Sequence, residues 1–502
     1  MEAFSPTSLS LSGLVVIITT GILAYSFYTW YRLSHIPGPF WPSLSKYWLV
    51  QQSLKGQTHS SLKEVTDKYG SLVRVGPNDL VTDDPDILRK MMAVRSPYTR
   101  GPWYDAMRFD PTRDNLLSMR DEEAHTKLRS KMAAGYSGKE NESMEATIDK
   151  QIQNLVNLIE RKYLSTSTEF RPMDLGQKGQ FFTLDVISDL AFGKAFGYLE
   201  QDDDVFDYIK ITDQYIPAML VMANIPWLAR LTHTRLFRNL LPKESDKLGF
   251  GAFIGVAKQV VRERFQPGAP AQKDMMASFI RHGLTQEQVS GESLLQIIGG
   301  SDTSAATIRI VLLHLMSSPP SYRRLQSEIS QAMKNGQISS PIKDSEARQL
   351  PYLQAVIKEG LRITPPATGL FNKQVPQGGD ILNGIFVPEG TQIGSSSYGI
   401  HHSKKIFGDD ADLFRPERWL DSEGEQLARM TSTVDLIFHY GKYQCLGKPV
   451  AMMELNKIYV ELLRRFDFAI LNVNRPARFQ NAGIWIITDF WVRVTRREIL
   501  EE

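Results

Sequence analysis

The segment around the only cysteine of the chain has the composition of a metal-binding loop. Cys445 is the one cysteine among 502 residues, and Gly441 and Gly447 lie on either side of it. Glycines allow the backbone to turn tightly and to approach a flat ligand closely. A helical pattern over 448–466 follows, and the amides at its start would stabilise a thiolate and lower its pKa. Haem iron needs such an anionic sulfur, although a cysteine nucleophile with His439 as its base would have a similar local sequence.

A second group of residues lies in a long apolar helical pattern that ends at Ser318. Gly299 and Gly300 are adjacent in the middle of this pattern, where each glycine costs about 1 kcal/mol relative to alanine. Either a closely approaching ligand or helix–helix packing would compensate for that loss. Asp302 and Thr303 come next. An acid and a hydroxyl on one helix are suited to proton transfer, whereas Thr303 could also hydrogen-bond within its own turn.

Two pairs of residues have the spacing of neighbours on one face of a helix. Glu359 and Arg362 stand before a Pro-Pro stop, and His125 and Arg129 stand near the start of the helical region. An exposed Glu–Arg pair would contribute only tenths of a kcal/mol. Arg418, further along the chain, could join the first pair, because two cations around one carboxylate can tie distant segments together. His125 alone could be a solvated surface histidine.

The segment 438–447 resembles the haem-binding loop of the cytochrome P450 family, Phe-x-x-Gly-x-Arg-x-Cys-x-Gly. The matching residues are Phe438, Gly441, Cys445 and Gly447. The resemblance implies that Cys445 is the axial ligand of the iron in haem b (iron protoporphyrin IX). Tyr443 stands where the family commonly has an arginine that helps to neutralise a haem propionate. This departure leaves the propionate contact open without affecting the iron ligand.

The segment 299–304 is similar to the family's oxygen-activating motif, Ala/Gly-Gly-x-Asp/Glu-Thr-Thr/Ser. The resemblance implies that Gly299 and Gly300 leave room for dioxygen. It also implies that Thr303 hydrogen-bonds to the oxygen and that Asp302 supplies protons through water.

The resemblance extends to residues that hold the domain and its cofactor together. Glu359, Arg362 and Arg418 resemble the family's buried Glu–Arg–Arg cluster, which implies a role in the architecture of the haem domain and none in the chemistry. The residues that the resemblance places at the haem propionates are His125, Arg129 and, in place of the usual arginine, Lys373.

The function implied by the resemblance is that of a monooxygenase, which inserts one oxygen atom of O2 into an apolar small molecule by hydroxylation, epoxidation or demethylation. Electrons would come from NADPH through a separate NADPH–cytochrome reductase, which is a flavoprotein. Three alternatives are an isomerase or dehydratase of the same fold that acts on peroxides without a reductase, a non-catalytic haem protein, and a cysteine hydrolase. The peroxide-acting relatives tend to lose the acid–threonine pair, which is intact here.

The substrate class is suggested by two further features of the sequence. The segments 96–100 and 445–448 resemble those of filamentous-fungal members near pisatin demethylase, which implies a place in secondary-metabolite biosynthesis. The segments expected to line the pocket are rich in Met, Phe, Trp and Ile and contain few charges, which favours an apolar substrate. These segments are Tyr98–Leu117, Phe206–Phe237, Gln296–Gly300, Ala367–Phe371 and Asn481–Trp485.

The elements that must position these residues are mostly helical. Helix-like patterns dominate from 85 to about 316, whereas 72–82 predicts two short strands around a turn, and strand patterns return at 385–387 and 484–494. The sequence therefore predicts a mainly α fold with small β-sheets (α+β). The resemblance makes it the cytochrome P450 fold, with residues 35–502 as the haem-binding catalytic domain.

Residues 1–34 are expected to form a membrane anchor and the start of a hinge. No residue from 9 to 31 is charged, and this length can cross about 30 Å of hydrocarbon as one transmembrane helix. A cleaved signal peptide is the alternative, but the basic segment that precedes its apolar core is absent. Because Arg32 follows the span, the catalytic domain would face the cytosol. We therefore expect a single-pass protein of the endoplasmic reticulum membrane, in contact with membrane lipid.

The charge of the chain limits its partners. A net charge of +2 gives no global field that would recruit nucleic acid, so an electrostatic partner must use a local patch. One cysteine also excludes an internal disulfide. Basic residues near the cysteine loop predict that the acidic reductase docks on this face, since none is expected to need a partner within the fold. They are Lys127, Lys131, Lys442, Lys448, Arg464 and Arg465.

Overall fold

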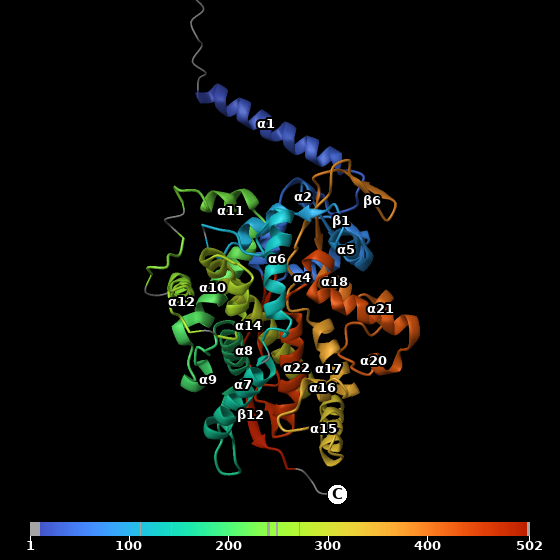
Figure 1. Ribbon diagram of the computed structural model, residues 1–502. Coiled ribbons are helices and arrows are strands. Elements are labelled where there is room, and N and C mark those ends of the chain that lie inside the picture. Colours follow the sequence, from blue (N-terminus) through green and yellow to red (C-terminus); the bar gives the residue numbers. More distant parts are fainter. Residues whose placement is uncertain are drawn as a thin grey trace, which may run out of the picture.

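The computed structural model describes residues 11–498, apart from 111, 142, 238–240, 247–248 and 271. Figure 1 shows α1 (Leu11–Arg32) projecting from a body in which helices predominate over strands. The predicted mainly α fold with small sheets is therefore confirmed.

The centre of the body is α14 (Gln286–Ser317), which contacts α8, α12, α17 and α22 (Figure 1). A capping box begins this helix: the Thr285 hydroxyl accepts the amide of Gln288 at 3.3 Å, and the Gln288 side chain accepts the amide of Thr285 at 3.0 Å. The helix ends where Pro319 begins the next one, as the sequence predicts. Its length brings residues from several distant segments against one rigid element.

The remaining helices surround α14, and α8 is buried along nearly all of its length. The long ones are α4 (Thr58–Tyr69), α6 (Glu122–Tyr136), α7 (Met144–Leu158), α8 (Leu175–Phe192), α10 (Tyr208–Ala223), α12 (Gly249–Arg264), α15 (Pro319–Lys334), α17 (Pro351–Ile363), α21 (Gly424–Val434) and α22 (Lys448–Leu463). The short ones are α2 (Phe40–Leu44), α3 (Tyr47–Leu54), α5 (Pro85–Met92), α9 (Tyr198–Gln201), α11 (Pro226–Thr232), α13 (Met275–Arg281), α16 (Asp344–Ala347), α18 (Ser397–His401), α19 (Lys404–Phe407) and α20 (Arg418–Asp421). The 3-10 turns include η1 (Pro102–Met107) and η6 (Gly441–Tyr443).

Small sheets join segments that are far apart in the chain. The largest has the order β1-β2-β8-β5-β3, with β1 (Leu72–Arg74), β2 (Asp79–Thr82), β8 (Gln392–Ser395), β5 (Lys373–Gln374) and β3 (Thr99–Arg100). β1 and β2 are antiparallel, which confirms the predicted hairpin. β3 pairs with β5 so that Arg100 lies opposite Lys373, a contact that matters for the site.

The predicted strand over 484–494 is divided into two strands of different sheets. β11 (Trp485–Thr488) pairs with β10 (Arg478–Asn481), whereas β12 (Trp491–Arg496) lies between β4 (Pro172–Asp174) and β9 (Phe466–Ile470). Asp489 breaks the run because its φ of 57° is left-handed, and aspartate tolerates that conformation better than the apolar residues around it. The predicted strand at 385–387 is β7 (Ile385–Val387), paired with β6 (Asp380–Leu382).

The C-terminal end of α1 is fixed to the body by a buried arginine. Arg74 donates to the carbonyl oxygens of Trp30 at 2.9 Å and Thr29 at 3.1 Å. It also donates to the carbonyl oxygens of Ser43, Gly76 and Pro77 in the body. Across the described part of the chain, the structure contains no helix with the length and apolar character needed to cross a membrane.

Candidate active site

The cysteine loop lies between η6 and the start of α22. The Cys445 amide donates to the Phe438 carbonyl at 2.7 Å, which closes the loop on itself. Gly441 has a φ of 56°, and a β-carbon there would lie 2.3 Å from the Met92 carbonyl oxygen, so only glycine fits. The loop shape thus follows from the glycine that the sequence motif requires.

The Cys445 thiol is free and exposed, next to the buried Tyr443. Burial of the surrounding loop raises the pKa of the thiol, and the amides of Gly447 and Lys448 and the charge of Arg129 oppose this rise only in part. The amides at the helix start thus lower the pKa of Cys445 as expected, but desolvation outweighs them and the net shift is upward. Coordination to a metal cation would supply the missing stabilisation of the thiolate.

His439, the base expected for a nucleophilic Cys445, is not suited to that role. Burial lowers the pKa of His439 to about 3, and its ring packs edge-on against Phe371 with a centroid separation of 4.8 Å. No hydrogen bond joins His439 to Cys445 among the residues that the structure describes. The hydrolase alternative is not supported by this geometry.

The two glycines of α14 have different surroundings. At Gly299 no atom lies within 4 Å of the place where a β-carbon would stand, and the residue is exposed although Ile298 and Ser301 beside it are buried. At Gly300 a β-carbon would lie 2.7 Å from Cγ1 of Ile187 on α8. Helix packing therefore explains Gly300, whereas Gly299 opens onto space that a ligand could use.

Asp302 and Thr303 follow on α14, each with partners. The Thr303 hydroxyl donates to the Gly299 carbonyl at 2.8 Å, which is the bond within its own turn. Asp302 accepts from the Gln180 amide at one carboxylate oxygen and from the Tyr208 hydroxyl at the other, at 3.3 Å. Burial raises the pKa of Asp302 to about 7, although Gln180 opposes the rise. A group with this pKa can both hold and release a proton near neutrality.

Three cations near the cysteine loop have no carboxylate partner among the described residues: Arg100, Arg129 and Lys373. Arg100 and Lys373 are buried, and burial lowers the pKa of Lys373 well below its ordinary value. Both lie against the ring of Tyr443, at 4.9 Å from the guanidinium carbon and 4.1 Å from Nζ. Uncompensated buried cations are costly, so this group of residues is suited to an anionic ligand.

Tyr443 and His125 complete this group. The Tyr443 hydroxyl donates to Glu122, which also pairs with Lys442 at 3.1 Å. His125 is buried, its Nδ1 has no hydrogen-bond partner, and its ring lies 5.6 Å from that of Tyr443. Burial and the nearby Arg100 lower the pKa of His125 to about 3, so the ring is neutral at physiological pH. The alternative of a solvated surface histidine is thereby excluded.

The exposed thiol, the open side of Gly299 and the unpaired cations fit a haem. Cys445 would bind the iron, and Arg100, Arg129 and Lys373 would bind the propionate carboxylates. Sequence reasoning missed Arg100 and its neighbour Tyr104, whose hydroxyl accepts from Lys373 at 2.7 Å. Only the pairing of β3 with β5 brings them to the site, and no local pattern reveals that pairing.

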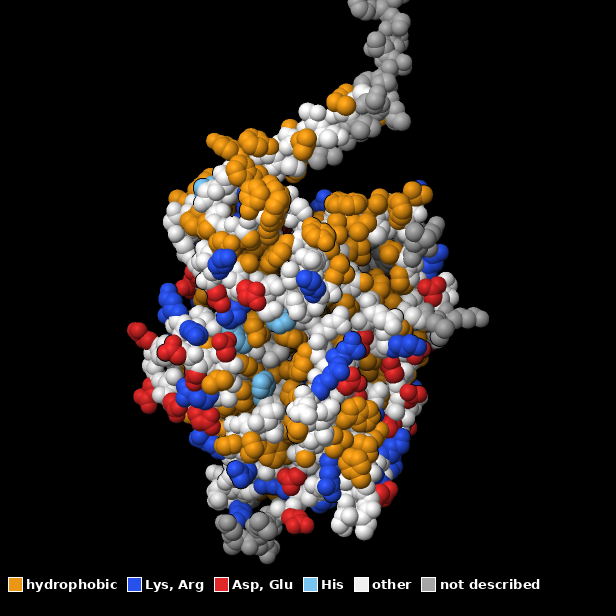
Figure 2. Space-filling model, turned by 180° about the vertical axis from the view of Figure 1, so that it is seen from behind, with side chains coloured by type: hydrophobic (Ala, Val, Ile, Leu, Met, Phe, Trp, Pro, Cys, Tyr) orange, Lys and Arg blue, Asp and Glu red, His pale blue; other side chains and the backbone are white. Residues whose placement is uncertain are grey.

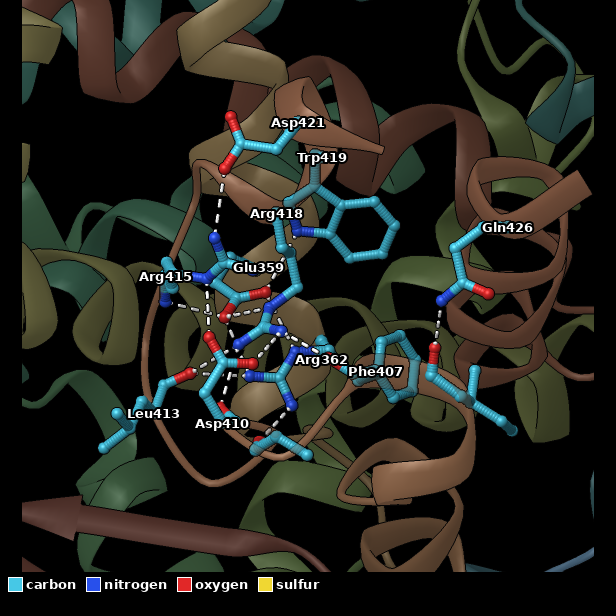
Figure 3. Close-up of polar contacts among 12 residues, drawn as sticks. Glu359, Arg362, Phe407, Asp410, Leu413, Arg415, Arg418, Trp419, Asp421 and Gln426 are labelled. Atoms are coloured by element: carbon cyan, nitrogen blue, oxygen red, sulfur yellow. Dashed lines mark hydrogen bonds and ion pairs between the residues drawn. The ribbon is translucent and has the colours of Figure 1, made fainter. Parts of the chain in front are cut away.

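Glu359, Arg362 and Arg418 form a buried cluster (Figure 3). Glu359 accepts from Arg362 at 2.7 and 2.9 Å and from Arg418 at 3.1 Å. Its remaining bonds come from the Trp419 indole at 3.0 Å and the Arg415 amide at 2.8 Å. All of these groups hold α17 and α20 together, in agreement with an architectural role.

The expectation that the basic residues near the loop need no partner within the fold is wrong for most of them. Lys442 pairs with Glu122, and Lys448 pairs with Asp435 at 2.9 Å. Lys131 donates to the Gly283 carbonyl at 2.8 Å, while Arg464 and Arg465 both pair with Glu461. Lys127 is the exception: it is exposed, and its side chain forms no hydrogen bond or ion pair with any described residue.

Comparison with known proteins agrees with the geometry. Residues 36–488 match the sequence model of the family described as Cytochrome P450. The chain is 42% identical over 496 residues to "Cytochrome P450 monooxygenase ABA1" of Pyricularia oryzae, with 97% of each chain covered. It is 41% identical to "Cytochrome P450 monooxygenase aba1" of Botryotinia fuckeliana, over 93% of this chain and 92% of the relative. It is also 30% identical to "Cytochrome P450 monooxygenase pkfB" of Emericella nidulans, over 98% of this chain and 97% of the relative.

Proposed function

The chain belongs to the cytochrome P450 family and is a monooxygenase, and on that premise we propose that it oxidises an apolar small molecule in fungal secondary metabolism. Its cofactor is haem b, and its electrons come from NADPH through a reductase. The observation that carries the site assignment is the exposed Cys445 thiol beside three cations that lack carboxylates. One feature suits an iron and the other suits the two propionates of a haem.

The reaction divides one O2 between substrate and water, so two protons and two electrons must enter for each oxygen atom inserted. When bound, the haem supplies the iron at which dioxygen is reduced. Asp302, which can hold a proton near neutrality, would supply protons on the side of α14 that carries Gly299. The Thr303 hydroxyl, which donates to the Gly299 carbonyl in this structure, would donate its hydrogen bond to the reacting oxygen instead.

The apolar substrate is supported by the side chains in the expected pocket segments. Buried charged residues are few in the five segments, whereas buried apolar residues occur in each of them. The buried apolar residues include Trp103, Phe109, Leu116, Ile216, Leu220, Ile297, Leu370 and Trp485. Apolar surface of this kind would bind a hydrophobic molecule by excluding water.

The test of the site is Cys445→Ser. In the wild type we expect the reduced complex with carbon monoxide to show the red-shifted Soret band that marks a thiolate ligand. The variant should lose this band, while Gln444→Ala, at an exposed neighbour, should keep it. A thiolate band that persists in Cys445→Ser would remove Cys445 from the iron.

We further propose that residues 1–34 anchor the protein in the endoplasmic reticulum membrane, with the domain of residues 35–502 facing the cytosol. The support is the apolar surface of α1, where Val16, Ile17, Leu23 and Phe27 are exposed. Figure 2 shows hydrophobic side chains along this helix and on the adjoining end of the body. In Figure 1, α2 and α11 lie at that end, and they carry the exposed Trp41 and Trp227. Such side chains favour a lipid interface.

Microsomes from a fungal host would test this topology. The full chain should resist carbonate extraction, and a variant that begins at residue 36 should be released. Asn141, Glu142 and Ser143 have the sequence of an N-glycosylation site. Asn141, whose side chain is buried in the fold, should carry no glycan. A shift in mobility after glycosidase treatment would place the catalytic domain in the lumen instead.

A further inference from the structure

A cavity of about 140 Å³ lies beside Asp302, on the side of α14 that faces α8 and α10. Its volume has room for several water molecules. Charged and polar side chains from β4, α8, α10, α14 and the end of β11 form part of its wall, and apolar side chains of α10 and β11 form most of the rest. The polar lining is Asp174, Gln177, Gln180, Thr212, Asp213, Asp302, Arg309 and Thr488. A polar, water-sized space therefore adjoins the carboxyl group that the reaction would use for protons.

Gln180 sets the orientation of the Asp302 carboxyl. Arg309 donates from Nε to the Gly176 carbonyl at 2.7 Å and from Nη2 to the Gln180 side-chain oxygen at 2.9 Å. Because a guanidinium only donates, the oxygen of the Gln180 amide must face Arg309 and its nitrogen must face Asp302. Oδ1 of Asp302 therefore accepts the Gln180 hydrogen bond, and a proton on Asp302 must lie on Oδ2, next to the Tyr208 hydroxyl.

Asp213 is the second carboxyl group of the cavity. It is half-buried on α10, and its side chain forms no hydrogen bond or ion pair with any described residue. Burial raises the pKa of Asp213 to about 6, although Arg309 opposes the rise, and the negative charge of Asp213 in turn raises the pKa of Asp302. Two carboxyl groups that both titrate near neutrality around one water-sized space can exchange protons.

The other charged groups around Asp302 are already engaged or lie further out. Asp174 caps α8 by accepting the Gln177 amide at 3.1 Å. Asp204, before α10, accepts two backbone amides, and β11 contributes no charged side chain. Arg309 is the one cation of the wall among the described residues. Asp213 is therefore the group best placed to supply Asp302 with protons.

We propose that Asp213 and this cavity form the inlet through which Asp302 regains its proton, with Gln180, held by Arg309, as the positioning residue that fixes which oxygen carries it. For each proton delivered, Asp302 releases one proton from Oδ2 and takes one from cavity water, so this exchange runs twice for each oxygen atom inserted. Asp213 returns a proton to that water and takes one from solvent. Only O–H bonds form and break, and no electron moves. This inference rests on the proposed role of Asp302.

The first test follows the carboxyl groups by infrared difference spectroscopy on the holoenzyme. Subtracting the spectrum of Asp302→Asn from that of the wild type identifies the protonated carboxyl band of Asp302, whose titration is then followed with pH. Asp213→Asn should move the midpoint of Asp302 to lower pH, because a negative charge is removed. Gln180→Leu should move it to higher pH, because a hydrogen bond to the carboxylate is lost. Equal midpoints in wild type and Asp213→Asn would overturn the coupling.

The second test measures NADPH oxidation with the reductase in H2O and D2O. Asp213→Asn should slow it by about tenfold and enlarge the solvent isotope effect, since proton supply becomes limiting. The matched control is Asp207→Asn, which removes an exposed carboxylate of the same helix end and should change neither the rate nor the Asp302 midpoint. If Asp302→Asn oxidises NADPH like the wild type, the role of Asp302 itself fails. If only Asp302→Asn is slow and Asp213→Asn is not, the inlet fails and the role of Asp302 stands.

Discussion

Tyr443 is the residue at which the cysteine loop departs from the family motif, and two buried cations lie against it. Arg100 and Lys373 are 4.9 and 4.1 Å from its ring centroid, and its hydroxyl donates to Glu122. Arg100 lies across this ring and comes from a different part of the chain. We therefore propose that Arg100 supplies the positive charge that the motif usually carries at the position of Tyr443.

Arg100→Gln should therefore weaken the retention of haem while leaving the thiolate spectrum unchanged. We expect haem transfer to apomyoglobin to become about tenfold faster, which corresponds to the loss of about 1.4 kcal/mol from one charged hydrogen bond. Arg95→Gln, at an exposed arginine close by, is the control and should transfer haem at the wild-type rate. Equal rates for both variants would show that Arg100 does not contact the cofactor.

Thr303→Ala should uncouple the enzyme. NADPH and oxygen should still be consumed, but more peroxide should be released per product, because the hydroxyl that orders the proton path is gone. Thr307→Ala, one turn further along α14, removes a similar hydroxyl that bonds only to the Thr303 carbonyl and should stay coupled. Unchanged peroxide in Thr303→Ala would mean that protons reach the oxygen by another route.

At the scale of elements, the Glu359 cluster joins helix α17 to the segment before α20. Burial alone would raise the pKa of Glu359, but the hydrogen bonds and charges of Arg362 and Arg418 outweigh burial and hold the pKa below its ordinary value. Glu359 therefore contributes stability above the pKa of an unfolded glutamate, near 4, and that contribution is lost as the pH falls through the lower folded pKa.

Glu359→Gln should reduce the free energy of unfolding at pH 7 by about 3–5 kcal/mol, since two buried arginines lose their carboxylate. The deficit relative to wild type should shrink in acid, where the wild-type carboxylate is protonated as well. Urea unfolding followed by circular dichroism measures both effects. Asp421→Asn, at an exposed carboxylate that pairs with Arg415, should change the stability by less than about 0.5 kcal/mol.

The elements show how far local sequence can predict this molecule. The hairpin of β1 and β2 and the ends of α14 follow from turn and capping residues, and the sequence predicts them. The division of 484–494 depends on one left-handed aspartate, and the approach of Arg100 to Lys373 depends on strand pairing. Asp213 likewise lines the same cavity as Asp302 only because the tertiary fold brings α10 and α14 to it, and no spacing within either helix indicates this.

At the scale of the whole molecule, most of the basic residues near the cysteine loop are engaged within the fold. Lys127→Glu should slow reduction by the reductase and weaken its salt dependence, because this exposed lysine is free to meet an acidic partner. Peroxide-driven turnover, which bypasses the reductase, should survive in Lys127→Glu. Lys442→Glu should reduce both activities, because it places a second carboxylate beside Glu122. Equal loss of both activities in Lys127→Glu would contradict reductase docking at this position.

The clamp that Arg74 forms on the carbonyls of Thr29 and Trp30 has a mechanical consequence. A helix of 22 residues is a lever about 33 Å long, and a tilt of ten degrees at its base displaces the far tip by about 6 Å. Arg74 holds two carbonyls at the base of the helix, and Arg32 of the helix bonds to Asn78, Glu389 and Thr391, so the lever has a set direction. Arg74→Ala would remove the first of these two attachments and so widen the range of directions in which the helix leaves the body.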